Sequence, residues 1–212
     1  MSLKDKKILI TAGPTWVAID PIRAITNIAT GQTGKILARL ASAKGARVRL
    51  FLSSAPAFEK IKGVSIKSFR YFQDLSSRLG SELKMHKYDC IIHNAAVSDF
   101  LVKNRAGRKI DSRRKGFKIG LARAPKIISE IRKNAPRSIL VMFKLEVNVS
   151  CAELIRRARR AQKKAGADFV VANTFKGRKL KSFVYNHKSM LAKADSRRSL
   201  ARKLLSILEK SL

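Results

Sequence analysis

Cysteine, acidic residues and aromatic residues are scarce in this sequence. Its 212 residues include 2 cysteines, 14 aspartate and glutamate residues together, and 7% aromatic residues. Cys90 and Cys151 lie far apart and lack the spacing of metal ligands, so we expect reduced thiols in a cytoplasmic protein. The shortage of aromatic side chains also leaves few platforms on which nucleic-acid bases could stack.

Long apolar runs are absent too. No run approaches the ~20 residues that a membrane-spanning helix needs. The charged start of the chain reaches Ile8 after too short a stretch for a signal peptide. We therefore expect neither membrane association nor secretion. The 45% hydrophobic content and the length suit one α/β domain, which we place at residues 1–212.

Positive charge is what the sequence has in excess. Lysine and arginine number 47, and the formal net charge is +33. Nucleic acid is the first partner to consider, because a basic protein gains affinity by releasing counterions from phosphates. The basic residues run through nearly the whole chain instead of forming a tail, so charge alone does not decide. Nucleic-acid binding stays open and is not favoured.

Strands and helices alternate along the sequence. Apolar and β-branched runs bounded by turn residues indicate strands, and apolar positions three and four apart indicate helices. We expect strands at 7–11, 47–52, 64–68, 89–93, 138–143 and 168–172, and helices at 31–43, 73–85, 125–133 and 152–165. This order favours an α/β fold with a Rossmann-like, doubly wound, mostly parallel sheet.

Two parts of the chain fall outside that alternation. Residues 100–120 form a long, strongly basic stretch that is too polar for a core and longer than most connections. Loops of this kind tend to be functional or disordered. Near the end, residues 181–192 resemble a C-terminal hairpin, and residues 196–212 read as a closing helix.

The glycines after the first strand bear on ligand binding, because a doubly wound sheet binds ligands beyond the carboxyl ends of its strands. A dinucleotide fingerprint places G-x-G-x-x-G directly between strand and helix, whereas a long insertion separates Gly13 from Gly31 and Gly34. An ordinary NAD site is therefore not expected. The Gly31-x-x-Gly34 turn can present N–H groups and a positive helix end to an anion, or serve only close helix–sheet packing.

Polar groups follow three further strands. Asp99, in Asn94-Ala-Ala-Val-Ser-Asp-Phe100, can accept hydrogen bonds from a base or a sugar, or it can cap a turn. Phe143-Lys-Leu-Glu146 and Ala172-Asn-Thr174 follow the next two strands. Four strand ends thus carry small or polar residues.

Together these segments resemble the phosphopantothenoylcysteine synthetase family, the ligase half of the bacterial bifunctional coenzyme A biosynthesis flavoprotein and the free-standing eukaryotic enzyme. The resemblance covers nearly the whole chain. It is carried by Ile10-Thr-Ala-Gly-Pro-Thr15, Asp20-Pro-Ile-Arg23 with Asn27 and the Gly-x-x-Gly turn, Ala95-Ala-Val-Ser-Asp-Phe100, Lys109-Ile110, Phe143-Lys-Leu-Glu146 and Val171-Ala-Asn173. The flavoprotein decarboxylase domain has no counterpart in the sequence, so a stand-alone ligase without flavin is expected.

The resemblance implies a specific reaction. CTP in most bacteria, or ATP in eukaryotes, activates 4′-phosphopantothenate to an acyl-nucleotidyl intermediate, and the amine of cysteine then displaces the nucleotide. Mg²⁺ is implied as cofactor, and no metal ligand is assigned to the chain. By the family pattern, the catalytic residues are Asn27, Arg23 and Lys109. Nucleotide contacts are Gly13, Asp99, Ala124, Pro125, Lys126, Ile127, Phe143, Arg160 and Lys164, and substrate contacts are Gly31, Gly34 and Ala96.

The same resemblance assigns a role to the long basic loop. In the family, the loop that holds Lys109 is a flap from a dimer partner, which implies a flap at about 100–120 and a homodimer. Closure would exclude water and favour aminolysis over hydrolysis. Asp111-Ser112 after Lys-Ile resembles the eukaryotic and free-standing forms, which leaves CTP or ATP open. Arg160 and Lys164 share a helix face as the family's paired basic ligands do, but a solvated basic face fits them equally.

Two other functional classes stay in view. Asn94-Ala-Ala-Val97 suggests an NAD(P) protein of the short-chain dehydrogenase type, but the compact glycine fingerprint is missing. Tyr71, Tyr88 and Tyr185 also lack a lysine four residues later. A nucleic-acid-binding protein on the same Rossmann-like fold is motivated by the charge.

Overall fold

A computed structural model describes residues 3–53, 60–176 and 179–212. Its central sheet contains β1 (Lys7–Pro14), β4 (Arg47–Ser53), β5 (Val64–Phe69), β6 (Cys90–Ala96), β9 (Ile139–Leu145), β10 (Phe169–Lys176), β11 (Lys179–Tyr185) and β12 (Met190–Ala194). The strand order is β12-β11-β10-β9-β6-β1-β4-β5. The six strands from β10 to β5 are parallel. On the side of β10, β11 and then β12 continue the sheet, each antiparallel to its neighbour. The predicted α/β, mostly parallel sheet is confirmed.

Several strands run past the ends predicted from their apolar runs. Prediction stops β1 at Thr11 and β6 at His93, yet the two strands stay paired as far as Pro14 opposite Ala96. Small residues such as Gly13 and Ala95 end the apolar pattern without ending the backbone hydrogen bonds. The small and polar residues of the sequence motifs therefore belong to the strands themselves.

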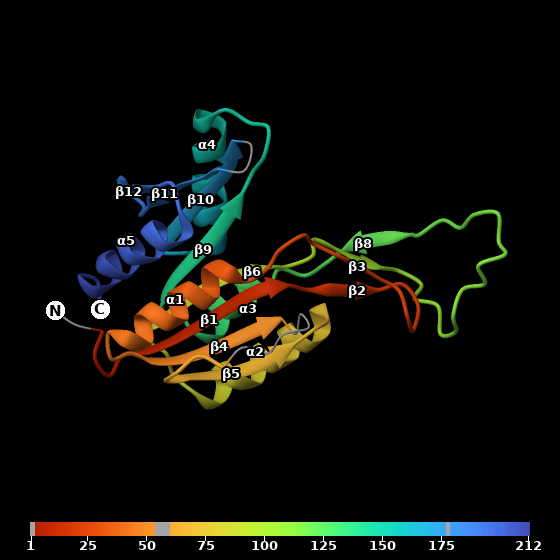
Figure 1. Ribbon diagram of the computed structural model, residues 1–212, viewed down its shortest axis with the longest axis horizontal. Helices are drawn as coiled ribbons and strands as arrows, with labels where there is room; N and C mark the ends of the chain where they lie inside the picture. Colours follow the sequence, from red (N-terminus) through yellow and green to blue (C-terminus); the bar gives the residue numbers. More distant parts are fainter. Residues whose placement is uncertain (1–2, 54–59, 177–178) are drawn as a thin grey trace.

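Helices cover both faces of the sheet (Figure 1). One face carries α1 (Gln32–Ala43) and α5 (Arg197–Glu209), and the other carries α2 (Phe72–Met85), α3 (Ile127–Asn134) and α4 (Cys151–Ala165). Serine side chains cap two of them, because Ser150 and Ser196 accept hydrogen bonds from the first turns of α4 and α5.

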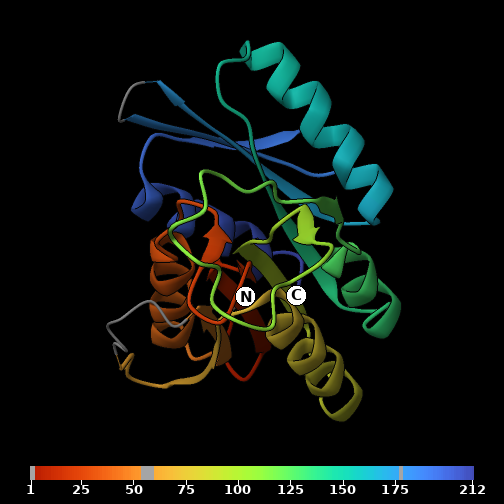
Figure 2. The ribbon, with the colours of Figure 1, turned by 90° about the vertical axis from the view of Figure 1, so that its right-hand side faces the viewer.

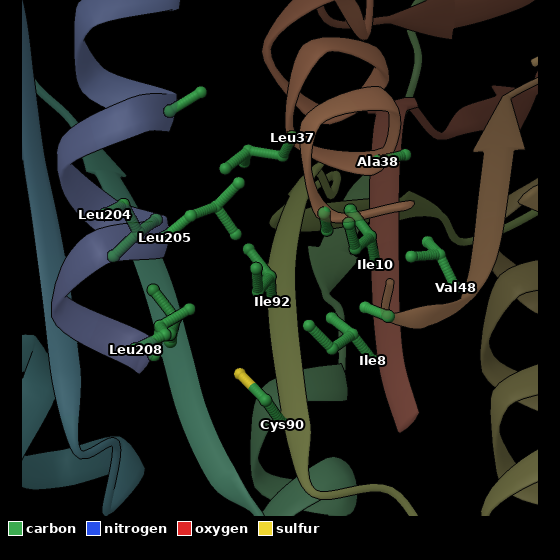
Figure 3. Packing of buried hydrophobic residues seen from close by; sticks show 14 of the residues in the cluster. Ile8, Ile10, Leu37, Ala38, Val48, Cys90, Ile92, Leu204, Leu205 and Leu208 are labelled. Carbon is green, nitrogen blue, oxygen red and sulfur yellow. The ribbon is translucent and has the colours of Figure 1, made fainter. Parts of the chain in front are cut away.

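The core between α1, α5 and the sheet is entirely apolar at its centre. Leu37 of α1, Leu205 of α5, Ile10 of β1 and Ile92 of β6 are all 0% exposed, and they lie in one cluster (Figure 3). Burial of each such side chain stabilises the fold by about 1.5–3 kcal/mol. This packing fixes the strands whose carboxyl ends form the site.

Two short hairpins extend the molecule to one side. They are β2 (Trp16–Ala18) with β3 (Ala24–Thr26), and β7 (Phe100–Val102) with β8 (Leu121–Arg123). Together with the loop 103–120 they form a projection that we call the arm (Figure 1). Figure 2 looks along the arm from its free end. The stretch predicted as a loop at 100–120 is thus a loop on a two-stranded base, and the β2–β3 hairpin was not predicted.

The helices also bear on membrane insertion. Across the described ranges, no helix combines the length and the apolar composition that crossing a bilayer requires.

Candidate functional site

A cavity of about 660 Å³ opens at the carboxyl ends of the parallel strands. This volume is within the range of small-molecule sites, and the place is the one at which doubly wound sheets bind ligands. Residues of α4, β10, β11 and α5 form one part of its wall, and five further segments form the rest. These five are Gly13 at the end of β1, residues 28–33 before and into α1, residues 93–99 of β6 and beyond, residues 125–129 at the start of α3, and residues 142–145 of β9.

Two helices begin at this cavity. Gly31 is the N-cap of α1, with φ of 70° and no side-chain cap, and Lys126 is the N-cap of α3, also without a side-chain cap. A Cβ on Gly31 would lie 3.2 Å from the backbone nitrogen of Gly13, so glycine allows α1 to start close to the end of β1. Uncapped N–H groups at two positive helix ends make the cavity favourable for phosphate or carboxylate.

Gly34 has a different environment from Gly31. A Cβ on Gly34 would lie 2.3 Å from the Cβ of Ala12, so its role in the structure is the close packing of α1 on β1. It is buried and is not among the residues that line the cavity. The assignment of Gly34 to substrate binding stays a prediction. Of the two roles considered for the Gly-x-x-Gly turn, Gly31 suits anion binding at a helix start, and Gly34 suits close packing of helix on sheet.

The cavity is rich in cations and poor in acids. Lys126, Lys144, Lys164 and Arg197 line it, and Asp99 is the acidic residue among the lining residues. Lys126 forms an ion pair with Asp99. In the described part of the chain, no three His, Cys, Asp or Glu side chains gather to hold a metal ion. A Mg²⁺ ion at this site would therefore find at most one protein carboxylate, that of Asp99, and would need its other oxygen ligands from a bound molecule and water.

His93 lies in the wall of the cavity and was missed as a site residue. Its Nδ1 is 2.8 Å from the Thr11 hydroxyl, which also accepts a hydrogen bond from the Ala95 N–H at 3.2 Å. The Thr11 hydroxyl thus connects the ring of His93 to the backbone of β6. Burial lowers the pKa of His93 to about 4, so the ring is neutral at pH 7. A lone histidine after an apolar run gives no sequence signal for such a position.

Asn173 of β10 is a second lining residue to which the sequence gave no role of its own. Its Oδ1 is buried and has no hydrogen-bond partner among the described residues. A buried acceptor without a partner is uncommon in folded proteins, since it loses its bond to water. Asn173 is therefore suited to accept a hydrogen bond from a ligand.

Most of the predicted nucleotide and substrate contacts gather around this cavity. Those that line it are Gly13, Gly31, Ala96, Asp99, Pro125, Lys126, Ile127, Phe143 and Lys164. Ala124 lies just behind, buried, and its N–H donates to the Asp99 carbonyl at 2.9 Å. Arg160 is exposed one turn before Lys164 on α4 and is not among the lining residues.

The three predicted catalytic residues lie in or beside the arm. Asn27 follows β3, and its Nδ2 donates to the carbonyl of Ala96 at 3.0 Å, which joins the arm to the cavity wall. Arg23 is paired with Asp20 at 2.6 Å, and Lys109 is exposed in the loop 103–120. Neither Arg23 nor Lys109 lines the cavity of its own chain.

Proteins of known name are similar in sequence to this chain over most of its length. The protein named "Coenzyme A biosynthesis bifunctional protein CoaBC" in Thermococcus kodakarensis is 42% identical over 177 residues, which cover 82% of this chain and 43% of that protein. The protein of the same name in Borreliella burgdorferi is 35% identical over 217 residues, covering 97% of this chain and 53% of that protein. The chain thus spans about half the length of these relatives.

A solved structure and a family model extend over the whole fold. The DNA/pantothenate metabolism flavoprotein from Streptococcus pneumoniae superposes with a TM-score of 0.86 at 28% identity, covering 98% of this chain and 100% of that chain. The model for the DNA/pantothenate metabolism flavoprotein C-terminal domain matches residues 3–210. The resemblance found in the sequence motifs is confirmed, and the chain belongs to the family of the DNA/pantothenate metabolism flavoprotein C-terminal domain.

Proposed function

We propose that this protein is a phosphopantothenate–cysteine ligase of coenzyme A biosynthesis that uses CTP or ATP. One observation carries the proposal: most of the family's motif segments, those at four strand ends and at the start of α1, line one cavity rich in cations. The names of the relatives in Thermococcus kodakarensis and Borreliella burgdorferi place those proteins in coenzyme A biosynthesis. Family membership supports the same pathway for this chain.

The proposed reaction has two steps. A carboxylate oxygen of 4′-phosphopantothenate attacks the α-phosphorus of the nucleotide, and pyrophosphate leaves. The amine of cysteine then attacks the acyl carbon, the bond from that carbon to the phosphate oxygen breaks, and the nucleoside monophosphate leaves as the amine loses a proton. Mg²⁺ bound with the nucleotide would neutralise phosphate charge, and Asp99 is the lining carboxylate that could contact it.

The chain's own contribution to this reaction is electrostatic. A triphosphate, a substrate phosphate and a carboxylate repel one another, so their approach requires fixed positive groups. The uncapped starts of α1 and α3 supply backbone N–H groups, and Lys126, Lys144 and Lys164 supply side-chain cations. Neutral His93 and the unpartnered Oδ1 of Asn173 are suited to contact uncharged donors or acceptors of the bound molecules.

A homodimer is part of the proposal. The arm projects away from the sheet (Figure 1), and Arg23 and Lys109 do not line the cavity of their own chain. The cavity of a second copy can receive them, and the loop 103–120 would then close over the activated carboxylate. We also place the enzyme in the cytoplasm, where thiols such as the free Cys90 and Cys151 stay reduced.

The deciding experiment supplies the purified protein with phosphopantothenate, cysteine and Mg²⁺ and compares CTP with ATP. We expect release of CMP or AMP together with phosphopantothenoylcysteine, both detected by mass spectrometry. Omission of cysteine should stop amide formation. If neither nucleotide gives the product, the ligase function is wrong.

A parallel measurement addresses the charge. Binding of labelled duplex DNA is followed as the salt concentration rises, because phosphate contacts give a steep salt dependence. Tight duplex binding in a protein that forms no amide would favour the nucleic-acid alternative. The formal charge of +33 is larger than the proposed reaction requires.

A further inference from the structure

Asp20 is buried, although most of the residues around it in the arm are exposed. It lies in the turn between β2 and β3, and its side chain is 0% exposed. Both carboxylate oxygens are occupied. Oδ1 accepts from the backbone N–H groups of Ile22 at 2.9 Å and Arg23 at 2.7 Å. Oδ2 accepts from Nη1 of Arg23 at 2.6 Å and from the N–H of Ile110 at 3.1 Å.

These contacts join the two halves of the arm. Ile110 belongs to the long loop, 90 residues away from Asp20 in sequence. The same Nη1 of Arg23 donates to the Ile110 carbonyl at 3.0 Å, so both backbone groups of Ile110 are held. A third contact, from the N–H of Ala106 to the carbonyl of Ile19 at 3.0 Å, lies next to this pair. We call the set around Asp20, Arg23 and Ile110 the clasp.

The clasp depends on the negative charge of Asp20. Burial by itself would raise the pKa of Asp20, but the N–H groups of Ile22, Ile110 and Arg23 and the guanidinium of Arg23 outweigh it and hold the pKa well below its usual range. Asparagine has the same shape but presents an NH₂ group where one oxygen stood. That NH₂ group would face N–H donors, so the hydrogen bonds that one of the two carboxylate oxygens accepts would be lost.

We propose that Asp20 is a positioning residue, which fixes the loop at Ile110 so that Lys109 and Arg23 are presented together from one arm. Hydrogen bonds that involve an ionised group are about twice as strong as neutral ones, which suits a segment with little apolar burial of its own. The consequence for catalysis rests on the proposed ligase function, whereas the holding of the loop does not.

Limited trypsin digestion tests the holding of the loop directly. Trypsin cleaves after lysine and arginine, which are abundant in residues 103–118. For Asp20→Asn we expect cleavage within 103–118 at least tenfold faster than in the wild type, with an unchanged rate elsewhere in the chain. Asp111→Asn is the matched control, since Asp111 is in the same loop and pairs with the exposed Arg113. Equal cleavage of Asp20→Asn, Asp111→Asn and the wild type would overturn the proposal.

Mixed dimers test the catalytic consequence. Chains carrying Asp20→Asn and Phe143→Ala are co-expressed with different tags, and the mixed dimer is purified. If the arm of one chain serves the cavity of the other, the pair contains one complete site, and we expect about half of the wild-type activity. Asp20→Asn combined with Lys109→Ala should gain nothing, because both defects are in the arm.

The outcomes of this second test separate the two proposals. Failure of Asp20→Asn to complement Phe143→Ala, while Lys109→Ala does complement it, would overturn the proposal that Asp20 acts by positioning the arm. If wild-type protein makes no amide with either nucleotide, the ligase function fails, and trypsin still decides whether Asp20 holds the loop. If no pair complements, the arm serves its own chain, and a normal turnover rate of Asp20→Asn would then overturn the role.

Discussion

The sheet and the arm are held in shape by different forces. Around the sheet, side chains such as Leu37, Ile92 and Leu205 are fully buried, and stability comes from apolar area removed from water. In the arm, Ile22 is 65% exposed and Phe117 is 47% exposed, and polar contacts such as the clasp at Asp20 set the conformation. A change in the sheet should therefore alter stability, and a change in the arm should alter activity.

The largest expected effect is on activity and comes from Lys109→Ala. Loss of one fixed charge that stabilises a transition state costs about 100- to 1,000-fold in rate. We expect that loss in nucleotide-dependent pyrophosphate release and a melting temperature close to that of the wild type, because Lys109 is exposed. Lys115→Ala, in the same loop, is the control and should retain activity. A large loss of thermal stability in Lys109→Ala would instead make Lys109 a structural residue.

The next effect is on stability and comes from Leu205→Ala in the core. Truncation of a fully buried leucine should lower the free energy of unfolding by about 2–5 kcal/mol, measured by urea denaturation. The matched truncation in the arm is Ile25→Ala, at a residue that is 40% exposed, and it should cost less than about 1 kcal/mol. Equal losses at the two positions would contradict the contrast between sheet and arm.

A smaller effect is expected from Glu82→Gln, a buried acid on α2. Glu82 is 1% exposed; Lys67 lies 3.1 Å away and Arg49 3.6 Å away, and the Tyr88 hydroxyl donates to it. Because Lys67 and Arg49 are partly solvated, we expect a loss of about 2 kcal/mol at pH 7, below that of a fully buried pair. Glu153→Gln, at a surface carboxylate that pairs with Arg156 and Arg157, should cost clearly less than Glu82→Gln.

The pH dependence of Glu82→Gln provides a further check. Burial would raise the pKa of Glu82, but the Tyr88 hydroxyl and the charges of Lys67 and Arg49 outweigh it and lower the pKa. The stabilisation is therefore complete above the unfolded-state pKa, about 4.3, and is lost as the pH falls through the lower folded-state pKa. The difference in the free energy of unfolding between wild type and Glu82→Gln should disappear below about pH 4. A difference that stays constant on acidification would show that the charge of Glu82 is not its source.

The same contrast explains what the sequence could predict. The strands and helices of the sheet follow from apolar periodicity, which is a local feature of the sequence. They and the C-terminal hairpin were therefore predicted with errors mainly at their ends. The β2–β3 hairpin was missed because its strands are three residues long, too short for a period-two pattern. Its turn is held by the side chain of Asp20 and a residue 90 positions away, a contact that no local pattern contains.

The candidate site was predictable to the extent that it follows strand ends. Gly13, Asp99 and Phe143 follow that rule and line the cavity. Arg160 and Lys164 share a helical periodicity, but only Lys164 lines the cavity, because spacing along a helix does not say which turn reaches a neighbouring element. His93 and the unpartnered Oδ1 of Asn173 needed the packing of the strands beside them to be visible.

The smallest predicted effect concerns Asn27, where the arm meets the cavity. Asn27 Nδ2 donates to the carbonyl of Ala96, and aspartate at this position would place a carboxylate against that carbonyl without a donor. We expect Asn27→Asp to slow amine attack by about tenfold, equivalent to about 1.4 kcal/mol in the barrier, and to change activation less.

Rapid quenching and mass spectrometry should then detect accumulated acyl-nucleotide in Asn27→Asp and little in the wild type. Thr26→Ala, at the neighbouring residue of β3, is the control for disturbance of the hairpin, since its hydroxyl donates to the backbone carbonyl of Thr15. Equal slowing of both half-reactions would contradict a role in the second step. It would show instead that Asn27 joins the arm to the cavity wall and affects both steps through the position of the arm.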